Sequence, residues 1–321
     1  MKSVLFYSFC LLLLLSTVSA QPPKSVQYPY PVKFFELTIE NQQARMAYMD
    51  VAPEKPNGGS VVLFHGKNFN GYYWKDVIPM FTNRGYRVVV PDQIGWGKSD
   101  KPNVHYSFHL LAANSKKLLD RLGIKKTIVL GHSMGGMLAT RFALMFPETT
   151  QKLILENPIG LEDYRTFVPY QSFEELYKSE LAATYESYKN YQKTYYPTWK
   201  PEYEQYVAAQ AEPLGRTDFP NMARVNALTT LMIYEQPVVY EFKNLQVPTL
   251  LIMGQEDRTV VGKARLPKEE QSKYGQYPQL GKKTNQEIKN SRLVELNGVG
   301  HIPHIQTPDK FEQAVFDFLN K

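Results

Sequence analysis

Residues 127–137, TIVLGHSMGGM, decide the fold of this chain. The first four are β-branched or apolar and predict a buried strand. The segment that follows, 137–146, has helical composition and ends before a proline. Between the two, Gly131, Ser133 and Gly135 form the pattern Gly-X-Ser-X-Gly. A strand, a tight turn and a helix in this order predict a nucleophile elbow, in which a strained turn exposes the serine hydroxyl at the carboxyl end of the strand.

The chemistry of the turn agrees with this interpretation. The flanking glycines have no Cβ atoms that would clash, and the first N–H groups of the helix point to the place where negative charge develops during attack on a carbonyl. Short glycine patterns also arise by chance in turns. The interpretation therefore depends on partners for Ser133 elsewhere in the chain.

Length and composition limit the kind of protein. The 321 residues, 43% of them hydrophobic, predict one large core, or a core with a lid, rather than two independent domains. The formal charge of +6 comes from charges of both signs without a dense Lys/Arg block, so we expect no nucleic-acid partner. The sequence has no P-loop, dinucleotide fingerprint or zinc-ligand cluster, so we expect neither a cofactor nor a metal.

The first twenty residues, 1–20, have the organisation of a signal peptide. Lys2 gives a positive start, 4–15 is a short apolar segment, and VSA at 18–20 is a small-residue cleavage site. Cleavage leaves a mature chain from Gln21 without cysteine, because the one cysteine lies in the apolar segment. We therefore expect an exported protein, in a bacterial periplasm or secreted, with no disulfide and no stable membrane anchor after signal cleavage.

Further apolar runs predict strands and helices in alternation. The runs at 34–40 and 45–51 flank a polar turn and predict an antiparallel hairpin at a sheet edge. The other predicted strands are 60–64, 86–90, 127–130, 152–156, 249–253 and 292–296, and the predicted helices include 72–83, 108–122 and 311–319. Most of these strands are continuous apolar runs separated by helices. We therefore expect a mainly parallel eight-stranded sheet flanked by helices on both faces.

One long interval, 161–242, contains no convincing buried strand. Ser172 and Glu175 form a capping box that predicts the start of a helix. Side chains at helical spacing follow it: Tyr177, Leu181, Tyr185, Tyr188 and Tyr195. We therefore divide the mature chain into a first part of the core, 21–160, a helical cap, 161–242, and a second part of the core, 243–321. Most of the tyrosines are interpreted as packing between cap and core, although tyrosine also suits a pocket wall.

A serine hydroxyl is a poor nucleophile without an adjacent base, and the base needs an acid that orients it. The last predicted strand is followed by NGVGH, 297–301, whose small residues allow the loop to turn back. This turn presents His301 at the carboxyl edge of the sheet, and we interpret His301 as the base. His304, whose loop continues into the last helix, is interpreted as a packing or pocket-rim residue.

The predicted acid is Asp257, in the sequence GQED at 254–257 after the preceding strand. The serine, the aspartate and the histidine then occur in the chain order Ser…Asp…His. Three other acidic residues compete for this role. Glu256 is expected to face solvent, Glu156 at the end of a strand is the alternative acid, and Asp92 is interpreted as structural because its loop precedes the nucleophile.

A tetrahedral oxyanion needs two backbone N–H donors. The amide of Met134, directly after the nucleophile, is one candidate. The amide of Lys67, in the loop after the first strand that follows the hairpin, is the other, and Asn68 adds a side-chain donor. We expect Asn68, Phe69 and Trp96 to contact substrate. The two aromatic residues are equally compatible with core packing.

Five motifs in this order resemble the α/β-hydrolase superfamily: LFHG at 63–66, PDQIGWGKSD at 91–100, GHSMGG at 131–136, GQED at 254–257 and GH at 300–301. Within the superfamily, the chain is similar to the capped branch that includes serine esterases, meta-cleavage-product (carbon–carbon bond) hydrolases, epoxide hydrolases and haloalkane dehalogenases. The resemblance implies an α/β-hydrolase fold with a helical cap inserted at the interval that the motifs leave uncovered.

The residue at the nucleophile position narrows the chemistry. Epoxide hydrolases and dehalogenases of the capped branch use an aspartate there, whereas Ser133 favours acyl transfer through an acyl-serine. The chain also lacks a His-Gly-Gly-Pro-Gly loop, which argues against a proline iminopeptidase. We therefore expect an exported serine hydrolase that cleaves a small or medium-sized carboxylic ester. The alternatives are a meta-cleavage-product hydrolase, which also uses Ser-His-Asp, and a non-catalytic ligand-binding protein with this fold.

Overall fold

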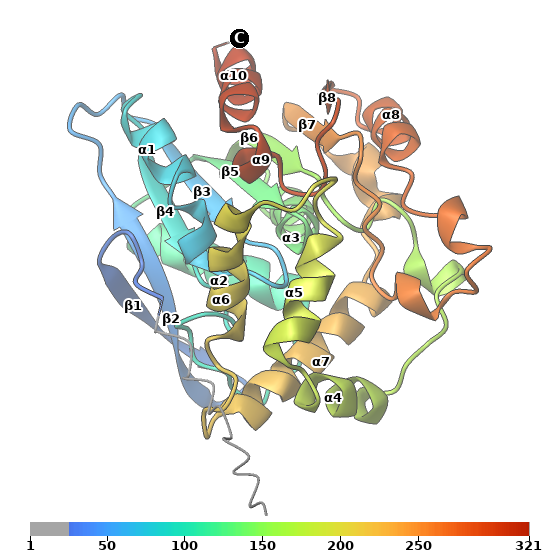
Figure 1. Cartoon of the computed structure of the whole chain (residues 1–321). Helices are drawn as coiled ribbons and strands as arrows, with labels where there is room; N and C mark the ends of the chain where they lie inside the picture. Colours follow the sequence, from blue (N-terminus) through green and yellow to red (C-terminus); the bar gives the residue numbers. More distant parts are fainter. Residues whose placement is uncertain (1–25, 321) are drawn as a thin grey trace, which may run out of the picture.

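The computed structural model describes residues 26–320, so the predicted signal peptide lies outside the described residues. One sheet of eight strands forms the centre of this part of the chain, and helices cover it (Figure 1). The strands are β1 (Val32–Ile39), β2 (Gln42–Val51), β3 (Ser60–Phe64), β4 (Arg87–Pro91), β5 (Thr127–His132), β6 (Thr150–Glu156), β7 (Thr249–Gly254) and β8 (Ser291–Leu296). The α-helices are α1 (Val77–Thr82), α2 (Phe108–Arg121), α3 (Met134–Met145), α4 (Phe173–Leu181), α5 (Tyr185–Lys193), α6 (Glu204–Ala211), α7 (Phe219–Glu235), α8 (Tyr277–Glu287), α9 (Pro303–Gln306) and α10 (Pro308–Leu319).

The strands lie in the order β1-β2-β4-β3-β5-β6-β7-β8. The pairs β1–β2 and β2–β4 are antiparallel, and all the other pairs are parallel. The predicted fold class, an α/β-hydrolase fold with a mainly parallel eight-stranded sheet flanked by helices, is confirmed. Parallel strands end at the same edge of a sheet, so the loops after β3, β5, β6, β7 and β8 are brought to one rim.

The predicted edge hairpin is confirmed, with a shorter turn than the sequence indicated. Ile39 pairs with Gln42, so the turn consists of Glu40 and Asn41 alone. Their φ values are 47° and 60°. Two consecutive residues with positive φ form the type of two-residue turn whose twist matches that of a hairpin.

Both faces of the sheet are buried, which explains the continuous apolar runs. Val62 and Phe64 of β3 belong to the core on one side, together with Phe142 of α3. Their neighbours Val61 and Leu63 belong to the core on the other side, which includes side chains of α1 and α10. Successive side chains of a strand point to opposite faces, so a strand covered on both sides has apolar residues at every position.

Helices α4 to α7 lie between β6 and β7, within the interval 161–242 that the sequence assigns to a cap. Helix α4 packs against α7, and α5 packs against α6. Figure 1 shows the four helices, in green-yellow to amber, grouped together in front of and below the sheet. Within residues 26–320, no helix combines the length and the apolar composition needed to cross a bilayer.

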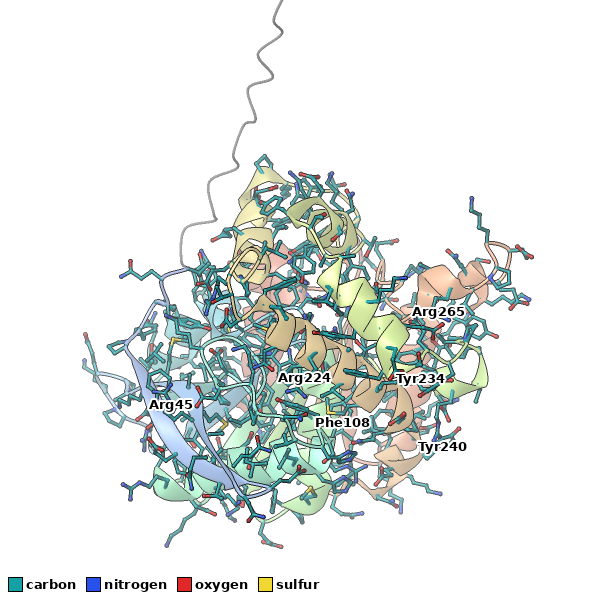
Figure 2. All side chains as sticks on the ribbon, turned by 90° about the horizontal axis from the view of Figure 1, so that it is seen from below. Arg45, Phe108, Arg224, Tyr234, Tyr240 and Arg265 are labelled. Carbon is teal, nitrogen blue, oxygen red and sulfur yellow. The ribbon has the colours of Figure 1, made fainter. Side chains whose placement is uncertain are left out.

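Helix α7 attaches this group of helices to the rest of the protein. Figure 2 shows Arg224 and Tyr234 at different points along α7. The Arg224 guanidinium donates to the Asn103 side chain, and the Tyr234 hydroxyl donates to the Val168 carbonyl at 3.2 Å. The side chain of Gln236, the residue directly after the helix, accepts a hydrogen bond from the first backbone N–H of α2 at 3.0 Å. Both ends of α7 are therefore anchored.

The prediction of one helix over 72–83 is wrong. The structure has a 3₁₀ turn, Gly71–Trp74, followed by the separate helix α1. Proline is tolerated in the first turn of a helix but disrupts its interior. Pro79 would lie in the interior of a helix over 72–83, whereas in α1 it is the third residue.

The tyrosines predicted to lie along one helical stripe are divided between two short helices. Helix α4 ends at Leu181, and α5 begins after Thr184, whose hydroxyl caps it. The predicted capping box of Ser172 and Glu175 is present at the start of α4. Leu181 is exposed, whereas Tyr195 is buried, so the stripe does not form a continuous packing face.

Candidate active site

The strand β5 and the helix α3 meet at Ser133. This residue has φ 58° and ψ −122°, so its backbone has the strained conformation that the sequence predicts for an elbow. A Cβ atom at Gly131 would collide with the Gly135 carbonyl oxygen, and one at Gly135 would collide with the Phe64 carbonyl oxygen. The two glycines therefore allow the close packing of helix on strand that the turn requires.

The three side chains predicted to act together do meet. The Ser133 hydroxyl lies 2.9 Å from Nε2 of His301, and Nδ1 of His301 lies 2.6 Å from Oδ2 of Asp257. A carboxylate oxygen only accepts hydrogen bonds, so Nδ1 carries the proton and Nε2 is free to accept from the serine. All three residues are buried.

Asp257 is held in its charged form by several donors. Asn157 donates to Oδ2 at 2.7 Å, and the Thr259 amide donates to Oδ1 at 2.8 Å. Burial raises the pKa of Asp257, but the His301 imidazole and the hydrogen bonds from His301, Thr259 and Asn157 outweigh it and hold this pKa below its usual value. Asn157, which follows β6 with φ 34°, was not predicted as a site residue.

His301 is also fixed by a residue from the interval between β6 and β7. Its backbone N–H donates to the Tyr195 carbonyl at 2.7 Å. The Tyr195 ring stacks on the imidazole with ring centroids 4.7 Å apart. The Asn68 side chain donates to the Tyr195 hydroxyl at 2.8 Å. Tyr195 therefore joins two loops at His301: the loop after β8, which carries His301, and the loop after β3, which carries Asn68.

The two predicted oxyanion donors have no competing partner. Within residues 26–320, neither the Met134 amide nor the Lys67 amide makes a hydrogen bond. The loop that carries Lys67 closely approaches the nucleophile, since a Cβ at Gly66 would lie 3.1 Å from the Ser133 Cβ. The Gly66 carbonyl, which shares a peptide with the Lys67 N–H, accepts from the Phe69 amide at 3.1 Å, and the Trp96 indole N–H donates to the carbonyl of the following peptide, that of Lys67, at 2.7 Å. Both amides are therefore available to an oxyanion.

A chain of buried hydrogen bonds connects the segments around Ser133. The Gly66 amide donates to the Tyr73 hydroxyl at 2.9 Å, and this hydroxyl lies 3.2 Å from Nδ1 of His132. Nε2 of His132 lies 2.8 Å from the His301 carbonyl oxygen. A carbonyl only accepts, so Nε2 is the donor and Nδ1 accepts from Tyr73. Burial and the neighbouring His301 and His304 imidazoles lower the pKa of His132 well below its usual value, which keeps the ring neutral.

The competing residues have other roles. The His304 amide and its Nδ1 both contact Oε1 of Glu156, at 2.8 and 2.9 Å, so these two residues pair with each other rather than with Ser133 or His301, and Nε2 of His304 has no hydrogen-bond partner among the described residues. Glu256 is exposed. Asp92 accepts hydrogen bonds from the Gly71 and Lys98 amides, each at 2.7 Å, which is a structural role.

Ser133 opens into a cavity of about 290 Å³ beneath α4, α5 and α7. The cavity is lined by Lys67, Asn68, Ser133, Ile159, Leu176, Ser179, Glu180, Tyr188, Tyr191, Tyr195, Gln210, Thr230, Thr259, Val261 and Gly262. Asn68 therefore lines the cavity, and its contact with substrate stays a prediction. Phe69 and Trp96 do not line this cavity: both are buried, and they line a smaller neighbouring cavity that shares Lys67 and Asn68 with it. Within residues 26–320, no group of three or more His, Cys, Asp or Glu side chains could hold a metal ion.

Comparison with known proteins agrees with the fold. The model of the alpha/beta hydrolase fold family matches residues 59–308, and the chain belongs to this family. The solved structure of a probable hydrolytic enzyme from Pseudomonas aeruginosa is 44% identical, has a TM-score of 0.90, and aligns over 92% of this chain and 96% of that one.

Curated relatives are more distant or match in part. The 2-hydroxy-6-oxo-6-phenylhexa-2,4-dienoate hydrolase of Comamonas testosteroni is 26% identical over 274 residues, which are 84% of this chain and 90% of that protein. An uncharacterized protein of Mycobacterium tuberculosis is 36% identical over 105 residues. That alignment spans 33% of this chain and 30% of the mycobacterial protein.

Proposed function

We propose that this protein is an exported serine hydrolase that cleaves a carboxylic ester of small or medium size. The observation that carries the proposal is the continuous hydrogen-bonded series from the Ser133 hydroxyl through His301 to Asp257. Membership of the alpha/beta hydrolase fold family supports it. Export rests on the signal-peptide pattern at 1–20, and a mature N-terminus at Gln21, read by mass spectrometry, is the expected result.

The geometry supports a two-step acyl transfer. Ser133 Oγ attacks the carbonyl carbon while Nε2 of His301 takes its proton. The resulting oxyanion accepts hydrogen bonds from the amides of Met134 and Lys67. His301 then gives the proton to the departing alkoxide, which leaves an acyl-serine. Water, deprotonated by the same imidazole, attacks this ester, and Ser133 recovers its proton as the carboxylic acid is released.

A fluorophosphonate probe tests the nucleophile. The wild-type protein should be labelled at one serine, and Ser133→Ala should not be labelled. Asp257→Asn should be labelled far more slowly, because loss of the orienting carboxylate in such a triad lowers the rate by about 10⁴-fold. Folded protein that reacts with neither the probe nor any ester would favour the non-catalytic ligand-binding alternative.

One observation favours a second reaction. The Comamonas testosteroni relative is named for hydrolysis of a dienoate that carries a ketone at carbon 6. Attack of Ser133 on that ketone would also give an acyl-serine, but the leaving atom would be a carbon instead of the alkoxide oxygen of an ester. Assay of this dienoate beside 4-nitrophenyl esters separates the two reactions, and turnover of the dienoate alone would assign the protein to carbon–carbon bond hydrolysis.

A further inference from the structure

Two opposite charges meet in the wall of the Ser133 cavity. Nζ of Lys67 lies 3.4 Å from Oε1 of Glu180, and the two side chains are 16% and 20% exposed. Lys67 belongs to the loop after β3, whereas Glu180 lies in the last turn of α4. A carboxylate in the last turn of a helix is disfavoured by the helix dipole, so the helix itself gives no reason for an acid at this position.

The two partners differ in how far their hydrogen-bonding capacity is used. Oε1 of Glu180 faces Lys67, and Oε2 accepts from the Asn226 side chain at 3.2 Å, so both oxygens are engaged. The Lys67 ammonium has three N–H donors, and Glu180 is its one hydrogen-bond partner among residues 26–320. The spare capacity of the pair therefore lies on the cation.

Two other groups in the cavity wall are also spare donors, whereas the one spare acceptor in the same network of described residues, Oε1 of Gln192, belongs to a residue that does not line the cavity. Nε2 of Gln192 donates to the Tyr206 carbonyl, which fixes the orientation of its amide, and also to Oε1 of Gln210 at 2.8 Å. The amide NH₂ of Gln210 and the Tyr188 hydroxyl have no hydrogen-bond partner within the described part of the chain. Both residues line the Ser133 cavity and its smaller neighbour, as Lys67 does. An ammonium, an amide and a phenol that can all donate are suited to an anion.

We propose that the ester substrate carries a carboxylate on its acyl chain and that Lys67 binds this carboxylate in place of Glu180. The inference rests on the proposed function, because it concerns the acyl group that becomes attached to Ser133 in the acyl-serine. The acyl group stays on the enzyme through both steps, so a charge contact on this side assists both. An uncharged alkyl chain gains no such contact and has to desolvate the ion pair.

The length of the lysine side chain sets the position of the carboxylate. The lysine stem holds the ammonium about 6 Å from its own Cα when extended. The Lys67 amide is the proposed donor to the oxyanion, so the second charge belongs several bonds from the scissile carbonyl. A half-ester of a medium-length dicarboxylic acid fits this spacing.

Three 4-nitrophenyl esters with the same six-carbon acyl chain test the proposal: the hydrogen adipate is anionic, the hexanoate neutral and the 6-aminohexanoate cationic. The wild-type protein should prefer the adipate to the hexanoate about tenfold in kcat/KM, the value of one charge-assisted hydrogen bond. The 6-aminohexanoate should be the poorest. The ratio of two substrates in one variant is independent of that variant's absolute rate.

The two charges should have opposite effects on this ratio. Lys67→Met should abolish the preference for the adipate, and Glu180→Gln should increase it, because the competing anion is removed. Glu174→Gln and Lys178→Met change the same charges on exposed positions of α4 and should leave the ratio unchanged.

Two results would overturn the inference. A preference for the 6-aminohexanoate that is lost in Glu180→Gln would make the acid the recognition group. Equal loss on all three esters in both variants would reduce the pair to a contact between α4 and the loop after β3. Failure of the proposed function is distinct: none of the three esters would then be hydrolysed in a Ser133-dependent manner.

Discussion

At the scale of single residues, the buried hydroxyl of Tyr73 connects three segments of the site. It accepts from the Gly66 amide, beside the proposed oxyanion donor, and donates to His132, which precedes the nucleophile. His132 in turn donates to the carbonyl of His301. Burial, together with the charge of Glu156, raises the pKa of Tyr73 well above its usual value, so the hydroxyl stays protonated and can donate.

We predict that Tyr73→Phe lowers kcat about tenfold with a smaller change in KM, because the oxyanion loop, the nucleophile and the base lose their common link while the cavity wall is unchanged. The free energy of unfolding should fall by about 1–3 kcal/mol, since a buried amide and a buried imidazole nitrogen lose their partner. Steady-state kinetics and denaturant unfolding measure the two effects.

Tyr72→Phe is the matched control. The Tyr72 hydroxyl donates to the Gln205 side chain of α6, and Tyr72 does not line the Ser133 cavity, so the loss of this hydroxyl should leave kcat unchanged. Equal kcat for Tyr73→Phe and the wild-type protein, with the expected loss of stability, would show that the chain of hydrogen bonds is structural only.

This contrast shows which site residues a sequence can reveal. Ser133, Asp257 and His301 follow strand ends in a fixed chain order, and their side chains meet as predicted. Tyr73 follows no strand end, and Asn157, although it follows β6, has no place in the Ser…Asp…His order. Their hydrogen bonds to His132 and Asp257 depend on side-chain directions that spacing does not encode.

At the scale of elements, one carboxylate links three strands at the antiparallel edge of the sheet. Asp50 of β2 accepts from Arg87 of β4 at 2.7 and 3.1 Å and from Lys33 of β1 at 3.2 Å. Burial raises the pKa of Asp50, but Arg87 and Lys33 lower it by more, so it lies below its usual value. The folded protein therefore holds this proton less tightly than the unfolded chain.

We predict that Asp50→Asn lowers the free energy of unfolding at pH 7 by up to about 1 kcal/mol, the upper range for a partly exposed ion pair. A lowered pKa stabilises the fold above the unfolded value of about 4, and this contribution is lost as pH falls through the lower folded value. The difference between the wild-type protein and the variant should therefore narrow below pH 4, as measured by denaturant unfolding.

Glu36→Gln, an exposed change on β1 at a position without an ion pair in the described residues, is the control and should have little effect at either pH. A constant difference between the wild-type protein and Asp50→Asn from pH 7 to pH 3 would contradict the linkage argument.

The sequence predicts correctly those helices and strands that are marked by one clear pattern. The strands of the sheet are continuous apolar runs, and the capping box of Ser172 and Glu175 marks the start of α4. The apolar spacing over 72–83 predicts a single helix. That prediction is wrong because Pro79 is tolerated only in the first turn of a helix, and α1 therefore begins at Val77. The spacing from Tyr177 to Tyr195 predicts one helical series, whereas in the structure Thr184 caps a second helix within it.

At the scale of the whole molecule, the Ser133 cavity is formed by two sets of residues far apart in the chain. Ile159, Thr259 and Val261 come from loops at the rim of the sheet, whereas Leu176 and Tyr188 come from α4 and α5. The position of the interval 161–242 over the site could be expected, because this interval follows the carboxyl end of β6, at the rim where Ser133 lies. The polarity of the cavity wall could not, because it depends on which faces of short helices turn inward.

The size of the cavity limits the substrate. A volume of about 290 Å³ is at the lower end for ligand sites, so short acyl chains should be preferred. Leu176 of α4 is 8% exposed and lines both this cavity and a second, smaller one, as Thr230 and Val261 also do. Truncation of Leu176 would join the two spaces.

We predict that the wild-type protein loses activity steeply on 4-nitrophenyl esters longer than about eight carbons, and that Leu176→Ala shifts the optimum to longer chains. The variant should also lose about 2–3 kcal/mol of stability, because a buried leucine leaves a cavity. Leu181→Ala, at a position that is 41% exposed on the same helix, should change neither property. An unchanged chain-length profile in folded Leu176→Ala would show that the acyl chain does not extend toward α4 and that the opposite wall, at Thr259 and Val261, sets the limit instead.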